Sequence, residues 1–379
     1  MARKQQRAAI VGVGYSTIGR RTGLTPQELT VQAVRAALDD AGLQPSDVDG
    51  FSTLGGEPLS DAKMLGMQPL HMFFSGGMSP AYSHAALMAV AAIEAGMAHT
   101  VVTTRIIQQQ PSGSERLQDA GPPPPIGGDM QFLVPFGGGI PTQWAGMLTR
   151  RRMAEFGETE DHYAAHVVTQ RHHASMNDDA FFRDPITKDD YFASRYVAKP
   201  LRLLDCDYPC DSGSAIIYTT EERARDLRQK PVFVESYALG SISDLNFEIL
   251  EDMVATAPHH VGEQLWSRTD LTPADIDCAQ LYDGFTFITF EWLEALGFCG
   301  KGEAGPFVAE GNTRLGGSLP TNTDGGACNV GRRHGANFCI EATRQLRGQC
   351  GERQVPGART AVWSNGAGPF GGAMVLTAE

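Results

Sequence analysis

The chain has 379 residues, of which 42% are hydrophobic and 20% are charged, and its formal net charge is −13 at pH 7. This composition fits a globular protein of about two domains, and the acidic balance argues against a nucleic-acid partner. We find no run of 18 apolar residues and no hydrophobic export region, so we predict a cytoplasmic protein without a membrane span. The seven cysteines are expected to be reduced. Cys206 and Cys210 lack a second pair at zinc spacing, so no metal site is predicted.

The first predicted elements are a buried strand over residues 8–14 and a helix over residues 26–41. Gly12 and Gly14 match the start of a dinucleotide-binding fingerprint, but the third glycine of that fingerprint is missing. We therefore predict no bound cofactor. A capping box is expected to open the helix, and Gly42 is expected to end it.

A short motif recurs in the two halves of the chain. Residues 43–49 read Leu-Gln-Pro-Ser-Asp-Val-Asp, and residues 271–277 read Leu-Thr-Pro-Ala-Asp-Ile-Asp. Each copy follows a predicted helix and precedes a predicted strand, so the pattern indicates an internal repeat of two α/β halves. The alternative is a chance match of a common turn.

Two segments of the first half are candidates for ligand contact. Residues 75–80 read Ser-Gly-Gly-Met-Ser-Pro and precede an Ala-rich helix predicted over residues 81–96. The N-terminus of that helix would direct backbone N–H groups toward a ligand over Gly76 and Gly77. The long segment 106–142 is expected to be a lid, a binding loop or an interface.

The stretch over residues 279–296 contains a candidate catalytic pair. A short strand over residues 279–282 is expected to end in an Asp-Gly break, followed by a helix over residues 285–296. Tyr282 and Asp283 would then lie at the carboxyl end of a strand, where ligands bind in open α/β sheets. A phenol and a carboxylate at that place can hold a proton near a substrate. The alternative is that Tyr282 is a half-buried aromatic residue at a strand end.

Two further glycine-containing segments follow. Residues 331–335 read Gly-Arg-Arg-His-Gly and lead into a helix predicted over residues 336–346. This arrangement suits an anion or an oxyanion, although a solvated basic helix end is the alternative. Residues 360–376 are predicted to form a hairpin, and its glycines can bring backbone N–H groups close to a ligand.

Together these motifs resemble the thiolase superfamily over essentially the whole chain, and most of all its sterol-carrier-protein-x thiolase and lipid-transfer branch. The matching segments are the Gly12-x-Gly14 strand and residues 40–43, 47–49, 322–326 and 345–348. The resemblance implies an α/β protein with a five-layer α-β-α-β-α duplicated fold. It also implies an N-terminal half over residues 1–235, with a loop insertion at about 106–200, and a C-terminal half over residues 236–379.

The chain departs from thiolases at the residues that carry their chemistry. Gly77 stands in the place of the nucleophilic cysteine, and Ser364 aligns with the second, acid/base cysteine. The two segments that supply oxyanion-hole side chains in thiolases read Tyr-Asp-Gly-Phe at residues 282–285 and Gly-Arg-Arg-His-Gly at residues 331–335. Because no thiolate is expected at these positions, we do not expect acyl transfer through an acyl-enzyme.

The Tyr-Asp-Gly-Phe motif and His334 resemble the steroid side-chain aldolases, which cleave a β-hydroxy acyl-CoA by a retro-aldol reaction. The resemblance implies a carbon–carbon lyase that converts a 17-hydroxy steroid C20-carboxyl-CoA into a ketone and a shorter acyl-CoA without a nucleophilic cysteine. Two tyrosines act in that family. Tyr282 matches one of them, and Arg332 occupies the place of the other.

The motifs and the resemblance lead to predicted roles for individual residues. We expect Tyr282 to act as base or proton relay, Arg332 to favour its ionisation and His334 to be a second proton carrier. Asp283 is expected to orient Tyr282 or a backbone group. The predicted substrate-binding residues are Gly77, Ser79, Gly366, Gly368 and Gly371.

Two other functions stay open at this point. One is a non-catalytic protein that binds an acyl-CoA or a sterol or acts as a scaffold, and the other is an acyltransferase subunit that uses other residues. The resemblance also implies a homodimer and a small partner protein with a zinc ribbon and an OB-fold, which together would form a heterotetramer. Residues 106–142 are a candidate contact surface for that partner.

Overall fold

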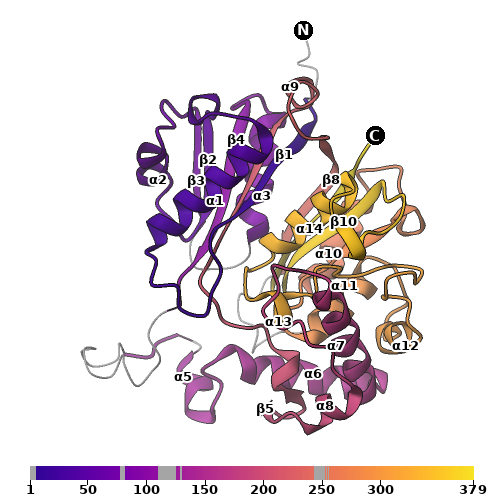
Figure 1. Ribbon diagram of the computed structural model, residues 1–379. Coiled ribbons are helices and arrows are strands. Elements are labelled where there is room, and N and C mark those ends of the chain that lie inside the picture. The colour runs from indigo at the N-terminus through magenta and orange to yellow at the C-terminus, as the bar shows by residue number, and fades with distance from the viewer. Residues whose placement is uncertain are drawn as a thin grey trace.

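The computed structural model describes residues 6–76, 82–109, 125–128, 130–242, 252, 254 and 256–379 (Figure 1). The strands are β1 (Ala8–Tyr15), β2 (Gly50–Leu54), β3 (Met72–Gly76), β4 (Thr100–Ile107), β5 (Tyr196–Ala198), β6 (Leu201–Arg202), β7 (Ser212–Thr220), β8 (Val232–Ser241), β9 (Cys278–Gln280), β10 (Thr360–Ala367) and β11 (Phe370–Thr377). The α-helices are α1 (Pro26–Ala41), α2 (Pro58–Leu65), α3 (Tyr82–Glu94), α5 (Met130–Leu133), α6 (Pro141–Phe156), α7 (Glu160–Ser175), α8 (Lys188–Ala193), α9 (Glu221–Ala224), α10 (Ala257–Trp266), α11 (Thr286–Ala295), α12 (Ala304–Ala309), α13 (Ala327–Val330) and α14 (Ala336–Arg347). Short 3₁₀ helices are η1 (Pro45–Asp47), η2 (Val134–Phe136), η3 (Leu203–Asp205), η4 (Pro273–Asp275) and η5 (Gly351–Arg353).

Nine strands form one mixed sheet in the order β3-β2-β4-β7-β1-β8-β11-β10-β9. The two halves of the sheet repeat one strand pattern. In the first half β7 lies between β4 and β1 and runs antiparallel to both, and in the second half β11 lies between β10 and β8 and runs antiparallel to both. In the second half, the position that corresponds to the edge strand β3 holds a single parallel bridge between Ala279 and Thr321 in place of a strand. The two parts of the sheet join through two residue pairs only, Ala9 with Phe233 and Ile10 with Val232.

Three clusters of buried residues hold the helices and the sheet together in five layers. Side chains of α1 and α2 cover one part of the sheet, and side chains of α10 and α11 cover the other part. Helices α3 and α14 share a third cluster with residues from strands of both parts, so these two helices form the central layer. The arrangement is the predicted α-β-α-β-α architecture, with the first part in indigo and purple and the second in orange and yellow in Figure 1.

Local sequence signals place the ends of the helices as expected. The capping box of α1 is present, and Gly42 ends the helix with a left-handed φ of 73°. The two copies of the repeated motif form η1 and η4, each closed by a hydrogen bond of 2.8 Å to its aspartate, from the Gln44 N–H to Asp47 and from the Thr272 N–H to Asp275. Each 3₁₀ turn leads directly into a strand, β2 or β9.

Several predicted bounds differ from the structure. The strand expected over residues 279–282 is β9, which ends at Gln280, so Tyr282 and Asp283 follow the strand at a distance of two and three residues. The expected loop over residues 106–142 contains the end of β4, the short helices α5 and η2 and the start of α6, while residues 110–124 and 129 lie outside the described residues. The proposed division at residue 235 stays a prediction, and that residue lies within β8.

Helices α5 to α8 lie together at one end of the molecule, drawn in magenta in Figure 1. Helices α6 and α7 contribute to the cluster under α11, and Arg152 of α6 is buried there between Glu158 and Glu294, each 2.6 Å away. Because a buried cation needs such partners, this pair of contacts fixes the segment to the second half of the sheet. Within the described residues, we find no helix that is both long enough and apolar enough to cross a membrane.

Candidate active site

Tyr282 lies in the turn between β9 and α11 and faces the central layer. Its backbone N–H donates to Ser364 Oγ on β10 at 3.3 Å, and its ring meets Phe338 of α14 edge-on at 6.5 Å between ring centroids. The ring also folds back over Gly284, where a Cβ would lie only 2.8 Å from the Tyr282 hydroxyl oxygen. A glycine at position 284 therefore leaves the room that this orientation of the phenol requires.

Burial raises the pKa of the Tyr282 phenol above its usual value of about 10. Asp207 raises this pKa further, while Arg332 and Arg105 lower it, and burial has the larger effect. The phenol is therefore protonated near neutral pH. We find no hydrogen bond between its hydroxyl and another described residue.

Arg332 lies near Tyr282, as the sequence predicts, but its side chain has a partner. Its Nε and Nη2 atoms donate to the two carboxylate oxygens of Asp207 at 2.8 and 2.7 Å. Asp207 in turn donates its backbone N–H to the Gly284 carbonyl oxygen at 3.1 Å, so the ion pair is tied to the Tyr282 turn. Arg332 lowers the pKa of Tyr282, as expected, but burial and Asp207 raise it, so the phenol stays protonated near neutral pH and a role of Arg332 in its ionisation stays a prediction.

His334 adopts a left-handed backbone conformation with φ of 48°, which is uncommon outside glycine and is concentrated at functional sites. Its Nδ1 accepts hydrogen bonds from Arg105 Nη2 at 2.5 Å and from Arg105 Nε at 3.2 Å. Burial, followed by the charges of Arg105 and Arg332, holds the pKa of the imidazole well below its usual value. The ring is therefore neutral and carries its proton on Nε2, which makes Nε2 a hydrogen-bond donor.

The sequence analysis missed Arg105 and Asn365. Arg105 is the only charged residue of β4, a feature that could have identified it, and its Nη1 donates to the Leu54 carbonyl oxygen at 2.8 Å. Asn365 on β10 accepts from the Ser83 N–H in the first turn of α3 at 2.9 Å and donates to the His334 carbonyl oxygen at 3.1 Å. These two side chains connect β4, β10 and α3 with the His334 loop.

The Asp283 side chain hydrogen-bonds to the backbone of the loop before α13. Its Oδ1 accepts from the Ala327 N–H at 2.9 Å, and its Oδ2 is buried without a hydrogen-bond partner among the described residues. Burial raises the pKa of this carboxyl well above its usual value. Of the two roles predicted for Asp283, this geometry matches the orientation of a backbone group and not the orientation of Tyr282.

The glycines of the last hairpin are explained by close packing. Gly366 has φ of 91°, and its carbonyl oxygen accepts from Trp292 Nε1 at 2.9 Å, while a Cβ on Gly371 would lie 3.1 Å from the same indole ring. The Gly368 carbonyl oxygen accepts from the Ala257 N–H at 2.8 Å. Their predicted contact with substrate stays a prediction. Gly77 and Ser79 lie outside the described residues.

Burial raises the pKa of all seven cysteine thiols. Ser364, which is predicted to align with the second thiolase cysteine, is buried, and its Oγ accepts a hydrogen bond from the Tyr282 N–H. In the free protein each thiol is therefore in its protonated, weakly nucleophilic form near neutral pH. The expectation that acyl transfer does not occur through a cysteine stays a prediction.

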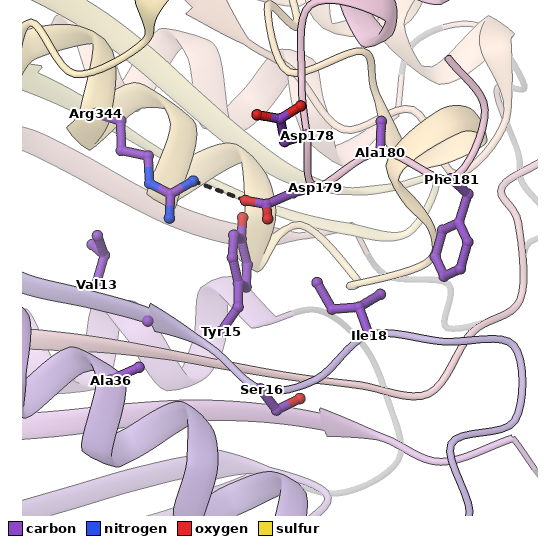
Figure 2. A pocket seen from close by; sticks show the side chains of 11 residues that line it. Val13, Tyr15, Ser16, Ile18, Ala36, Asp178, Asp179, Ala180, Phe181 and Arg344 are labelled. Carbon is purple, nitrogen blue, oxygen red and sulfur yellow. Dashed lines mark hydrogen bonds and ion pairs between the residues drawn. The ribbon is translucent and has the colours of Figure 1, made fainter. Parts of the chain in front are cut away.

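A cavity of about 660 Å³ lies beside the cluster and is lined by Arg105 together with residues of β2, α2 and the start of α1. A second cavity of about 510 Å³ lies between β1 and residues 178–181 (Figure 2). In the second cavity Arg344 pairs with Asp179 at 3.1 Å beside Tyr15, whose pKa is raised by burial to about 12. None of the predicted site residues that the structure describes lines either cavity, but Arg105, which hydrogen-bonds to His334, lines the first, so we place the candidate site beside that cavity.

Comparison with known proteins gives a consistent set of matches. A family model described as thiolase C-terminal domain-like matches residues 241–377. A steroid side-chain-cleaving aldolase of Thermomonospora curvata is 38% identical, over 90% of this chain and 90% of that protein. The 17-hydroxy-3-oxo-4-pregnene-20-carboxyl-CoA lyase of Mycobacterium tuberculosis is 39% identical, over 90% of this chain and 92% of that protein.

Solved structures also match over nearly the whole chain. The structure of an Ltp2-ChsH2(DUF35) aldolase superposes with a TM-score of 0.89 at 33% identity and covers 98% of each chain. A monomeric SCP2-thiolase like protein type 1 from Mycobacterium smegmatis superposes with a TM-score of 0.73 at 16% identity, over 99% of this chain and 78% of that chain. At that identity the second match supports the fold alone.

Proposed function

The chain belongs to the thiolase superfamily, in its branch of SCP2 thiolases, and from this premise we propose that it is a carbon–carbon lyase acting on an acyl-CoA thioester. The observation that carries the proposal is the cluster of Tyr282, His334, Arg105 and Arg332 in a protein whose thiols are all protonated. A retro-aldol reaction needs proton transfer and stabilisation of an enolate but no nucleophile. The cluster supplies groups for both tasks.

The proposed substrate carries a hydroxyl group on the β-carbon of the thioester. As the bond between the α- and β-carbons breaks, the Tyr282 phenol gives its own proton to the α-carbon and takes the hydroxyl proton onto its oxygen in the same event, so that the oxygen never carries two protons. The β-carbon becomes the carbon of a ketone, and the electron pair of the broken bond, which develops as a thioester enolate, forms the new C–H bond at the α-carbon. Because the phenol starts protonated, we assign it the role of proton relay, which needs no ionised tyrosine in the resting protein.

His334 is proposed to stabilise the enolate. Arg105 fixes the imidazole as the neutral tautomer with its proton on Nε2, so that Nε2 can donate to the thioester oxygen where negative charge develops. Arg105 is therefore a positioning residue, since it acts through His334. The positive charge of Arg105 also lowers the pKa of the Tyr282 phenol, so it stabilises negative charge on the phenol oxygen during proton transfer.

The finer assignment of substrate and partner follows the relatives. We propose a 17-hydroxy steroid C20-carboxyl-CoA as substrate, because the 39% identical relative from Mycobacterium tuberculosis is a 17-hydroxy-3-oxo-4-pregnene-20-carboxyl-CoA lyase. We also propose a DUF35-type partner, since the similar structure is an Ltp2-ChsH2(DUF35) aldolase. We further propose that this partner has a zinc ribbon and an OB-fold, that the chain forms a homodimer, and that the chain holds no bound cofactor.

The test is to incubate the purified protein, with and without a DUF35-type partner, with a 17-hydroxy steroid C20-carboxyl-CoA. A lyase releases a ketone and a shorter acyl-CoA in equal amounts, which mass spectrometry detects. A carrier or scaffold returns the substrate intact. An acyltransferase transfers an acyl group to an acceptor and leaves no equimolar ketone.

A further inference from the structure

Asp49, His71 and His99 come together at the end of the sheet opposite the candidate active site. Each of them immediately precedes a strand, and the three strands β2, β3 and β4 are parallel neighbours with β2 in the middle. The three side chains therefore meet at the amino ends of the strands. Arg105 of β4 lies six positions after His99, a distance of about 20 Å in an extended strand.

The two imidazoles converge on one carboxylate oxygen. Asp49 Oδ2 lies 3.2 Å from His71 Nδ1 and 3.0 Å from His99 Nδ1, and one possible ligand atom from each residue lies within 4.8 Å of the others. The side chains of His71 and His99 are 57% and 61% exposed, so the cluster opens to solvent. Both rings can turn about their side-chain bonds without disturbing the core.

Backbone hydrogen bonds fix the three residues to one another. The Asp49 carbonyl oxygen accepts from the His71 N–H at 2.7 Å, and the Asp49 N–H donates to the Thr100 carbonyl oxygen at 3.1 Å. The Asp49 carboxylate also accepts from the N–H groups of His99 and Thr100 at 2.9 and 2.8 Å. The positions of the Cα atoms are therefore set before any ligand arrives.

We propose that Asp49, His71 and His99 form a binding site for a divalent zinc ion, with water as the fourth ligand. Tetrahedral zinc takes histidine nitrogen and carboxylate oxygen at about 2.0–2.2 Å, which places neighbouring ligand atoms roughly 3.3 Å apart. The separations of 3.0 and 3.2 Å between nitrogen and oxygen already match that spacing. Two imidazoles with one carboxylate favour zinc over calcium or magnesium, which prefer all-oxygen sites.

Such an ion joins the ends of three strands and lies too far from His334 to take part in the chemistry. No metal is predicted from the sequence, because Cys206 and Cys210 lack a second pair at zinc spacing. Histidines and an aspartate spaced as 49, 71 and 99 give no recognisable pattern until the sheet order is known. The alternative is that the two histidines only hydrogen-bond to a carboxylate whose task is to hold the start of β4.

The test uses the full chain, treated with chelator, free of any histidine tag and titrated with zinc chloride in a calorimeter. We expect one zinc ion per chain at this site, and we expect His71→Gln and His99→Gln each to weaken its binding by at least tenfold. His172→Gln, which removes another exposed histidine on α7, is the matched control and should leave the affinity unchanged.

A second readout is the midpoint of thermal unfolding, which zinc should raise in the unmodified protein and in His172→Gln but not in His71→Gln or His99→Gln. The proposal is overturned if the unmodified protein binds no zinc. It is also overturned if the His71→Gln and His99→Gln proteins bind zinc with the affinity of the control.

Discussion

Tyr282 and His334 are both neutral in the structure, although burial acts on them in opposite directions. It raises the pKa of the phenol, which is neutral when protonated, and lowers the pKa of the imidazole, which is neutral when deprotonated. Both groups can therefore donate a hydrogen bond near neutral pH. Charged side chains surround both groups. Asp207 forms an ion pair with Arg332 and offsets its charge, and the Arg105 guanidinium donates hydrogen bonds to His334.

Replacement of Arg105 by methionine should lower kcat while the protein still folds. Without a donor to Nδ1 the imidazole of His334 can adopt the wrong tautomer, a fault that costs a catalytic imidazole up to about 10⁴-fold in rate. Nitrogen NMR of His334 should show the proton on Nε2 in the unmodified protein and a mixture of tautomers in Arg105→Met. Arg105→Lys keeps a cationic donor and should restore part of the rate. Equal kcat in the Arg105→Met and unmodified proteins would contradict the positioning role.

Glu291 of α11 offers a test of the electrostatics that does not depend on catalysis. The side chain is buried, its Oε1 has no hydrogen-bond partner among the described residues, and burial raises its pKa to about 8. Between the unfolded-state pKa of about 4.3 and that value, the folded state binds a proton that the unfolded state lacks, so stability falls as pH rises. Glu291→Gln, which is neutral throughout, should therefore gain stability over the unmodified protein.

Urea unfolding at several pH values measures this gain. The difference between Glu291→Gln and the unmodified protein should grow by about 1.4 kcal/mol per pH unit from pH 5 to pH 7.5. Glu222→Gln, at an exposed site on α9, should show no such growth. A gain that is constant with pH would mean that Glu291 is not protonated in the folded state.

The turn between β9 and α11 is the element that aims the phenol. Gly284 has an ordinary φ, so alanine fits its backbone, but the new Cβ would lie 2.8 Å from the Tyr282 hydroxyl. Gly284→Ala should therefore displace the phenol and lower kcat by on the order of 10²-fold, the loss expected from a misplacement of about 1 Å. Gly127→Ala, where no atom lies within 4 Å of the new Cβ, is the control for enzyme assays and thermal unfolding. An unchanged kcat in Gly284→Ala would show that the ring orientation is unimportant.

At the same scale the sequence predicts helices and turns better than contacts. The capping residues of α1 and the start of α14 are local signals, and both are confirmed. Arg105 could not be assigned, because its contact with His334 depends on the order of the strands. Asp283 could not be oriented either, since its partner is a backbone N–H in a different glycine loop.

The two halves of the sheet, which meet where β1 pairs with β8, repeat one strand pattern. The repeated sequence motif that forms η1 and η4 indicates this repeat. The family and the fold could be predicted because many motifs match in order along the chain. The third strand of the second half could not be predicted, because it is reduced to the bridge at Thr321. The cluster of Asp49, His71 and His99 also became visible only once β3, β2 and β4 were known to be neighbours.

The most direct measurement is the rate at which Tyr282→Phe cleaves a 17-hydroxy steroid C20-carboxyl-CoA in the presence of a DUF35-type partner. The hydroxyl makes no hydrogen bond within the described residues, so the Tyr282→Phe protein should fold normally and unfold at the usual temperature. Tyr196→Phe, on β5, is the control, and its thermal unfolding is measured too, because the Tyr196 hydroxyl donates to Glu160 at 2.9 Å and accepts from Arg202 at 2.8 Å. We predict that Tyr282→Phe loses about 10²- to 10⁴-fold in kcat, the range for removal of a group that transfers a proton, while Tyr196→Phe keeps full activity. A folded Tyr282→Phe protein that cleaves the substrate at the unmodified rate would contradict the proposed relay.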